Sequence, residues 1–436
     1  MKYSYPLKIL NFFFFLKKIK SSNFLKDVKI LIIGTIISQI IAIASITILS
    51  RIFTPNDYGL LALFNSILVV TANIVTLSYP IRIILPKKDW EGQQLVLISI
   101  LLSFGVGTIL LFFSFLLSNS SLRLGILEGW ISFAIIGGIL LSIINTLNYW
   151  FNRNSLYKKI TYLQIMQSVI LTSYSLVMGF LSIVDGLIFA QLFALSTSLI
   201  IFIFLSGLKY NKDHFFGLTQ IAKKHKNAPK YLYPGNLLDI LTSQLPFLLI
   251  TLWFTQEMTG YYRMAFSCLN IPAAFFGSAI AQIFYKRFTR AWPDATAAKV
   301  ILKKTWLLLF AIGLPVFLII AIAGETIFSF GLGSSWKTAG SMASILSFMC
   351  LFSLLHSPTS TTILAMGNES LYTIYSAAAL FYRTLSLYIG YLQNDLLFGL
   401  KLLTTFEIIM IIIYQYIVIK KINIQIVIDS KKNKKI

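Results

Sequence analysis

The amino-acid sequence predicts an all-α integral membrane protein with about twelve transmembrane helices. Apolar blocks long enough to cross a bilayer recur roughly every 35 residues along the 436-residue chain. Hydrophobic residues make up 57% of the sequence and charged residues only 12%, about half the usual share in soluble proteins. Basic residues gather in alternate connections, as they do in multi-pass membrane proteins. A soluble globular core does not fit this pattern.

Each predicted span is an apolar run of about 20 residues with few charges. The first six spans are predicted over residues 30–50, 60–82, 95–117, 127–150, 162–182 and 186–206. After a polar stretch, six more are predicted over residues 234–254, 264–285, 305–323, 342–363, 371–392 and 396–419.

The positions of Lys and Arg predict how the bundle is oriented. Of the 37 basic residues, 30 fall in connections on one side: before residue 30, at 87–88, 153–159, 209–230 and 286–304, and after residue 419. Cationic connections stay in the cytoplasm, so both termini are predicted to be cytoplasmic. The net charge of +22 therefore indicates topology and contact with membrane lipids. Because the cations are spread over short loops, we expect no nucleic-acid partner.

A weak internal repeat predicts two six-helix lobes. Phe53, Thr54 and Gly59 recur 201 residues later as Phe254, Thr255 and Gly260, in each case after the first span of a set of six. Both halves begin on the same side, which is typical of a parallel repeat with substrate bound between the halves. The predicted segments are an interfacial N-terminal stretch (1–27), a first lobe (28–206), a linker (207–233), a second lobe (234–419) and a basic tail (420–436).

The sequence lacks the residue patterns that membrane enzymes need. Of its three histidines, His214 and His225 lie in the linker and His356 lies inside a predicted span, and no histidine cluster, carboxylate pair or phosphate-binding glycine loop is evident. The predicted outward loops are short. We therefore expect transport of a solute without catalysis, a metal site or a cofactor other than a coupling ion.

Several motifs resemble one family of membrane exporters. The segment Leu49-Ser50-Arg51-Ile52-Phe53-Thr54-Pro55-Asn56-Asp57-Tyr58-Gly59 resembles the first-loop signature of Wzx-type polysaccharide flippases. These are the O-antigen and capsule repeat-unit transporters of the MOP (multidrug/oligosaccharidyl-lipid/polysaccharide) superfamily. Similar motifs follow in the family's order at 229–231, 244–246, 260–262, 271–285 and 330–340.

The resemblance implies a MATE-like fold and a function in polysaccharide synthesis. The two lobes would open alternately to each side of the bacterial cytoplasmic membrane. They would carry undecaprenyl-pyrophosphate-linked oligosaccharide to the outer leaflet, for O-antigen, capsule or exopolysaccharide. The implied partners are this polyprenyl-linked glycan, membrane lipids, and the polysaccharide polymerase with its chain-length machinery. Where the second span of many relatives ends in an arginine, glutamate and small-residue pattern before its proline, this chain reads Ser78-Tyr79-Pro80-Ile81-Arg82-Ile83-Ile84-Leu85-Pro86. A glutamate is missing there, so its coupling role cannot be transferred.

Ionisable residues inside predicted spans are candidates for substrate contact, because a charge in the bilayer is costly unless it has a partner or a task. Arg383 lies about 12 residues, or roughly 18 Å, into its span. Arg383 and Lys401 could together hold a pyrophosphate, since arginine binds phosphate with two parallel bonds. The equal alternative is a structural pair between Arg383 and Glu407. Arg82, Arg51 and Arg263 are further cationic candidates, although each could simply lie at the membrane interface.

Two polar helix faces complete the candidate set. Asn236, Asp239 and Ser243 share one face of the seventh span, next to a proline, Pro246, that could bend the helix during gating. Asp239 and Glu407 are the candidates for coupling to H⁺ or Na⁺, with a plain structural role as the alternative. Asn145 and Asn148 form a stripe on the fourth span that suits either sugar hydroxyls or contacts between helices.

Two other functions compete with the flippase interpretation. A MATE-like multidrug exporter would have a cavity that favours cations, which the basic residues Arg383 and Lys401 argue against. A membrane glycan polymerase or ligase would need a large outward loop with catalytic residues, and the sequence predicts none.

Overall fold

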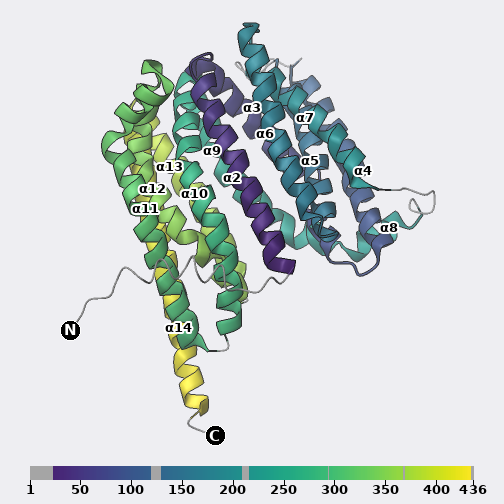
Figure 1. The fold of residues 1–436 in the computed structure, drawn as a ribbon, viewed down its shortest axis with the longest axis vertical. Helices are drawn as coiled ribbons and strands as arrows, with labels where there is room; N and C mark the ends of the chain where they lie inside the picture. The colour runs from purple at the N-terminus through teal and green to yellow at the C-terminus, as the bar shows by residue number, and fades with distance from the viewer. Residues whose placement is uncertain (1–22, 119–128, 209–215, 293, 367–368, 434–436) are drawn as a thin grey trace.

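The computed structural model describes residues 23–118, 129–208, 216–292, 294–366 and 369–433. Within these ranges the secondary structure is helical, and twelve of the helices have 20 residues or more (Figure 1). The first six are α2 (Asn23–Leu49), α3 (Pro55–Ile74), α4 (Asp89–Ser118), α5 (Ile131–Arg153), α6 (Tyr157–Phe180) and α7 (Gly186–Ser206). The second six are α9 (Tyr233–Trp253), α10 (Gln256–Ala291), α11 (Ala295–Leu332), α12 (Lys337–Ala365), α13 (Glu369–Leu392) and α14 (Leu396–Asn433).

The predicted all-α membrane fold is confirmed, and each predicted span overlaps one long helix. By length and hydropathy alone, nine helices among the described residues qualify as membrane-crossing. We refer to α2–α7 as the N-lobe and to α9–α14 as the C-lobe. The end of the bundle that carries the α3–α4, α5–α6 and α10–α11 connections and the linker is called the basic end. The other end is called the opposite end.

The second predicted span, 60–82, is wrong in its extent. Helix α3 ends at Ile74, and Leu77 and Ser78 then adopt left-handed backbone angles, with φ of 48° and 60°. A short 3-10 helix, η1 (Tyr79–Ile84), follows. Pro80 has no backbone N–H and restricts the residue before it, so the α-helix cannot run on through this segment. Arg82 consequently lies in the 3-10 turn and not at the end of a spanning helix.

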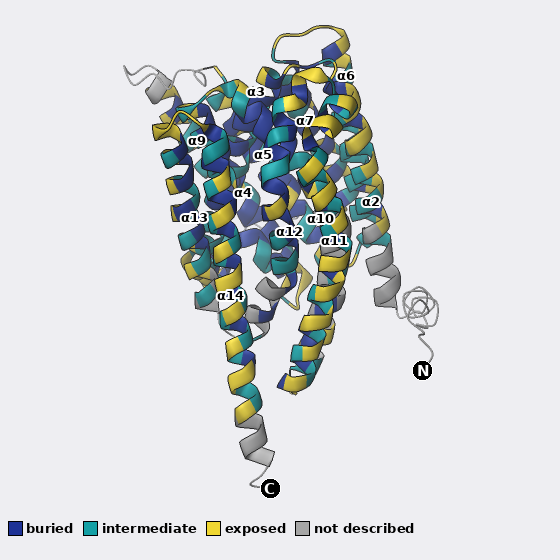
Figure 2. Ribbon diagram, turned by 90° about the vertical axis from the view of Figure 1, so that its left-hand side faces the viewer, coloured by how far each residue is buried: buried dark blue, intermediate teal, exposed yellow. Residues whose placement is uncertain are grey.

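Helices α10, α11 and α14 extend furthest beyond the predicted spans. Helices α10 and α11 have 36 and 38 residues, so the predicted 286–304 connection is mostly helical. Helix α14 continues to Asn433, which makes most of the predicted basic tail a helical extension below the bundle (Figure 2). The predicted interfacial stretch 1–27 lies outside the described residues up to residue 22.

The inter-lobe linker is attached to the N-lobe at the basic end. Its short helix α8 (Leu218–Lys224) packs Ile221 into a cluster with residues of η1, α4 and α5. The Lys224 ammonium lies 2.5 Å and the His225 imidazole 3.0 Å from the Glu91 carboxylate at the start of α4. The Tyr79 hydroxyl donates to the carbonyl of Ala222 at 3.2 Å. The linker therefore braces the segment in which α3 breaks.

Each lobe has its own apolar core, and a third core joins the lobes. One cluster consists of N-lobe residues between Leu60 and Phe202, and another of C-lobe residues between Phe284 and Ile422. The joint core includes Phe53 and Tyr58 of the N-lobe with Trp336 of the C-lobe. All three residues lie at the opposite end of the bundle, so the two lobes are packed together at that end.

The repeated glycines meet at this joint core. A Cβ atom added to Gly59 of α3 would lie 1.8 Å from the carbonyl oxygen of Gln256, and one added to Gly260 of α10 would lie 1.8 Å from that of Pro55. Gln256 and Gly260 stand 201 residues after Pro55 and Gly59, so the contact is reciprocal. Thr54 and Thr255, also repeat partners, cap the two helices. Helices α3 and α10 therefore touch backbone to backbone, as glycines allow.

Trp336 completes the closure of the opposite end. Its side chain is fully buried, and its indole N–H donates to the backbone carbonyl of Ser50 at 2.8 Å. The rings of Tyr58 and Tyr261 make edge contacts with it, at centroid distances of 5.2 and 6.2 Å. The Ser50 hydroxyl in turn donates to the carbonyl of Leu332 at 3.0 Å. The opposite end is thus sealed by contacts between the lobes.

Candidate substrate cavity and buried ion pair

A polar cavity of about 430 Å³ lies between the lobes in the basic half of the bundle. The N-lobe wall comes from the end of α3, the break after it, η1 and α5, and the C-lobe wall comes from the start of α9. The lining residues are Ala72, Asn73, Thr76, Ser78, Pro80, Ile81, Asn145, Asn148, Tyr149, Asn236, Asp239 and Ile240. None of these lining residues is a buried member of the joint core, so the cavity lies outside the region where the two lobes are packed together.

The break after α3 shapes this cavity. Helix α3 ends at Ile74, the left-handed angles of Leu77 and Ser78 turn the chain into η1, and residues on both sides of this turn line the cavity. Two non-glycine residues in this backbone region cost of the order of 1–3 kcal/mol each, so the surroundings must hold them. The Asn236 amide donates to the Ser78 hydroxyl at 3.1 Å, a contact that joins the two lobes across the cavity.

The lining is rich in amides and hydroxyls and carries one formal charge. Asn145 is exposed to the cavity and Asn148 is half-buried in its wall. Within the described part of the chain, neither amide hydrogen-bonds to a neighbouring helix, and the choice between sugar contact and contact between helices stays a prediction. Asp239 is the one ionisable lining residue apart from the Tyr149 phenol. Such a surface can hydrogen-bond to a ligand with many hydroxyls.

Arg383 and Glu407 form an ion pair inside the C-lobe. The guanidinium Nη2 lies 2.8 Å from Glu407 Oε2, Nε donates to the same carboxylate at 2.9 Å, and Nη1 donates to the carbonyl of Thr242 at 3.1 Å. The Tyr382 hydroxyl also donates to Glu407, at 2.7 Å. The side chains of Arg383 and Glu407 are 23% and 3% exposed, respectively. A buried carboxylate with this many donors forms a satisfied network that ties α9, α13 and α14 together.

The structure places the other predicted residues in different surroundings. Lys401 is exposed on the second turn of α14, and no interaction joins it to Arg383 among the described residues. Arg51 is exposed in the α2–α3 connection at the opposite end, and Arg263 lies over the Phe247 ring at 5.7 Å. None of these lines the cavity, and the joint phosphate role of Arg383 and Lys401 stays a prediction.

Three predicted residues lie close to the cavity without lining it. Arg82 follows the lining residue Ile81 and is half-buried. Ser243 is exposed one turn beyond Asp239 on α9. Helix α9 continues through Pro246 without ending, so bending at this proline during gating stays a prediction.

Sequence reasoning missed Asn73, Thr76 and Ser78, which form much of the N-lobe wall. Their positions follow from the early end of α3, for which Pro80 was the available signal. It also missed Trp336 as the residue that seals the opposite end.

The chain is similar in sequence to one family and in fold to transporters of one superfamily. The sequence model of the family described as polysaccharide biosynthesis protein matches residues 48–341. No curated protein matches the chain in sequence. The structure resembles the lipid II flippase MurJ in an inward closed conformation, with a TM-score of 0.69, 13% identity, and coverage of 89% of this chain and 87% of that one.

It also resembles a multidrug resistance MATE family transporter of the MOP superfamily in an inward-facing conformation. The TM-score is 0.65 at 12% identity, covering 90% of this chain and 94% of that one. A third similar structure is that of a mutant of the Vibrio cholerae MATE transporter VcmN, with a TM-score of 0.56 at 11% identity and coverage of 92% and 96%.

Proposed function

Because the chain belongs to the polysaccharide biosynthesis protein family and has the fold of MOP superfamily transporters, we propose that it is a flippase for lipid-linked oligosaccharide repeat units. The substrate would be a glycan on undecaprenyl pyrophosphate, moved to the outer leaflet for O-antigen, capsule or exopolysaccharide. The observation that carries the proposal is the cavity between the lobes, lined by amides and hydroxyls.

The arrangement of the lobes supports alternating access. The cavity lies in the basic half, and the seal around Gly59, Gly260 and Trp336 lies at the opposite end. The positive-inside rule favours a cytoplasmic basic end, and the cavity would then face the cytoplasmic side, from which the lipid-linked units have to be moved. Opening the seal while closing the basic half would move the site to the other side.

We infer that a coupling ion, if one is used, acts through Asp239. Its carboxylate lines the cavity and has no hydrogen-bond partner among the described residues, so a proton or Na⁺ could bind there without breaking existing contacts. Glu407 fits this role less well because its carboxylate already accepts hydrogen bonds from Arg383 and Tyr382.

Asp239 also favours a second candidate function, export of cationic drugs. A cavity whose single formal charge is a carboxylate attracts cations, and two of the similar folds are MATE transporters. The candidates differ in phenotype, because loss of a drug exporter raises drug sensitivity and leaves the surface glycan unchanged.

Deleting the gene should abolish the surface polysaccharide and leave its lipid-linked repeat units in the inner leaflet. The check is glycan analysis of the cell surface together with extraction of lipid-linked intermediates. Normal surface glycan with increased drug sensitivity would favour the exporter. Single unpolymerised units on the surface would instead favour a polymerase.

Replacing both Asn145 and Asn148 by leucine should lower export by at least tenfold at an unchanged protein level. Leucine has a similar volume but leaves glycan hydroxyls in the cavity without partners, at a cost of about 1–3 kcal/mol for each lost group. Surface glycan is measured against the amount of protein in the membrane. The matched control is Asn152→Leu, an exposed residue on the same helix that does not line the cavity. Equal export by the double variant and this control would contradict the cavity assignment.

A further inference from the structure

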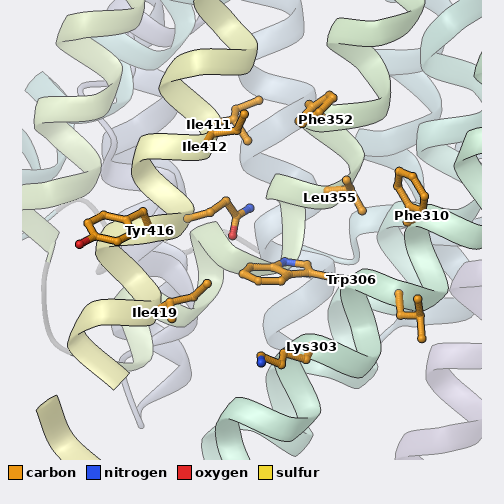
Figure 3. A pocket seen from close by; sticks show the side chains of 11 residues that line it. Lys303, Trp306, Phe310, Phe352, Leu355, Ile411, Ile412, Tyr416 and Ile419 are labelled. Atoms are coloured by element: carbon orange, nitrogen blue, oxygen red, sulfur yellow. The ribbon is translucent and has the colours of Figure 1, made fainter. Parts of the chain in front are cut away.

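The C-lobe carries a second pocket, separate from the substrate cavity. It has a volume of about 530 Å³ and lies between α11, α12 and α14 (Figure 3). Its lining is apolar apart from Lys303 and Gln415 and shares no residue with the cavity between the lobes. The volume is within the range of about 300–1,000 Å³ that is usual for ligand sites.

This pocket lies on the surface of two helices, α11 and α14, whose length and hydropathy qualify them as membrane-crossing. Leu307 of α11 and Tyr416 of α14 stand at its sides and are 70% and 65% exposed. Helix α14 makes its main contacts with α11, α12 and α13, all in the C-lobe. Exposed apolar side chains on membrane-crossing helices indicate contact with lipid, so we expect the occupant to come from the bilayer and to be a long apolar chain.

The polar boundary of the pocket lies at the basic end. Lys303 precedes Trp306 on α11, and Figure 3 shows Lys303 at the lower edge of the pocket with Trp306 above it. Lys299 and Lys304 are on the same stretch of α11, and Lys420 and Lys421 follow Ile419 on α14. Lysines and a tryptophan at one end of an apolar groove are typical of the membrane interface. They would face a phosphate headgroup of the adjacent leaflet.

We propose that this pocket is a binding site for an anionic phospholipid, with one acyl chain between α11 and α14 and the phosphate on Lys303. The polyprenyl tail of a transported substrate fits less well, because the glycan of that substrate would occupy the cavity between the lobes, and that cavity shares no lining residue with this pocket. The proposal does not depend on the identity of the transported substrate.

The test uses the full-length protein in detergent and native mass spectrometry with added phosphatidylglycerol or phosphatidylcholine of identical chains. We expect phosphatidylglycerol to bind roughly fivefold more tightly than phosphatidylcholine, because one basic side chain beside an anionic headgroup changes the affinity by about this factor. Lys303→Glu should abolish this preference, whereas the adjacent Lys304→Glu, which does not line the pocket, should keep most of it. Equal binding of the two lipids, or equal effects of the two variants, would overturn the proposal.

A second test fills the pocket with larger side chains. Ile412→Trp should reduce binding of both lipids, and Ile413→Trp, at a neighbouring exposed position outside the lining, should not. Leu307→Trp and Leu308→Trp repeat this comparison on α11, so that the result does not depend on one variant folding. Undiminished binding in monodisperse pocket-filling variants would refute the site. Polyprenyl phosphate that binds in preference to phosphatidylglycerol, and is lost in the same variants, would assign the pocket to a substrate tail instead.

Discussion

Replacing Gly260 by alanine should nearly abolish export, because the added methyl group would lie 1.8 Å from the carbonyl oxygen of Pro55. Two helix backbones are in contact at this point, so no side chain can rotate away to make room. Overpacking of this kind costs about 1–3 kcal/mol, and more where the backbone has to move. A loss of that size in one of two alternating states shifts their ratio by about 5–150-fold.

The direction of this shift can be measured at Ser50, which is 3% exposed beneath the seal. In a background without Cys268 and Cys350, a Ser50→Cys variant should resist an impermeant thiol reagent added from outside. Adding Gly260→Ala should make it react, because α3 and α10 are forced apart at the opposite end. Surface glycan is measured in parallel.

The reciprocal contact supplies an internal check. Gly59→Ala should have the same effect as Gly260→Ala, because its methyl group would meet the carbonyl oxygen of Gln256 at the same 1.8 Å. The control is Gly105→Ala in α4, where nothing lies within 4 Å of the added atom. Normal export in both interface variants, with Ser50→Cys still protected, would show that this contact does not form the seal.

Arg383→Gln alone should remove most of the folded protein, and adding Glu407→Gln should restore both its level and export. Removing the guanidinium leaves a carboxylate that is 3% exposed without its charge partner, at a cost of about 3–5 kcal/mol. Glutamine at position 407 removes that charge and still accepts the hydrogen bond from the Tyr382 hydroxyl. The measurements are protein level and thermal stability in the membrane, with surface glycan per molecule.

The double variant separates the two roles predicted for Arg383. Its Nε, Nη1 and Nη2 atoms all donate to groups within the C-lobe, which supports the structural role. A stable double variant that cannot export would instead place Arg383 at the substrate phosphate. In that case Arg383→Lys should keep partial activity, because its charge survives without the two parallel hydrogen bonds.

Much of the fold could be predicted from the sequence, whereas less of the site could be. The spans were predictable because roughly 20 apolar residues identify a membrane helix without knowledge of its neighbours. The end of α3 at Ile74 was missed because the apolar run continues to Ile84, and hydropathy alone does not show a backbone break. Asn145, Asn148, Asn236 and Asp239 were selected as two separate helical faces, and the structure brings both faces to one cavity.

The sequence by itself determined the all-helical membrane architecture, and it contained the repeat in which Gly59 and Gly260 correspond. Tertiary structure alone decided that these two glycines touch, that Arg383 pairs with Glu407 while Lys401 stays apart, and that a polar cavity between the lobes lies beside Ser78. The physical reason is that insertion of a helix depends on its own transfer from water to lipid. Which side chains meet depends on the rotation and tilt of each helix, and packing against neighbouring helices fixes both.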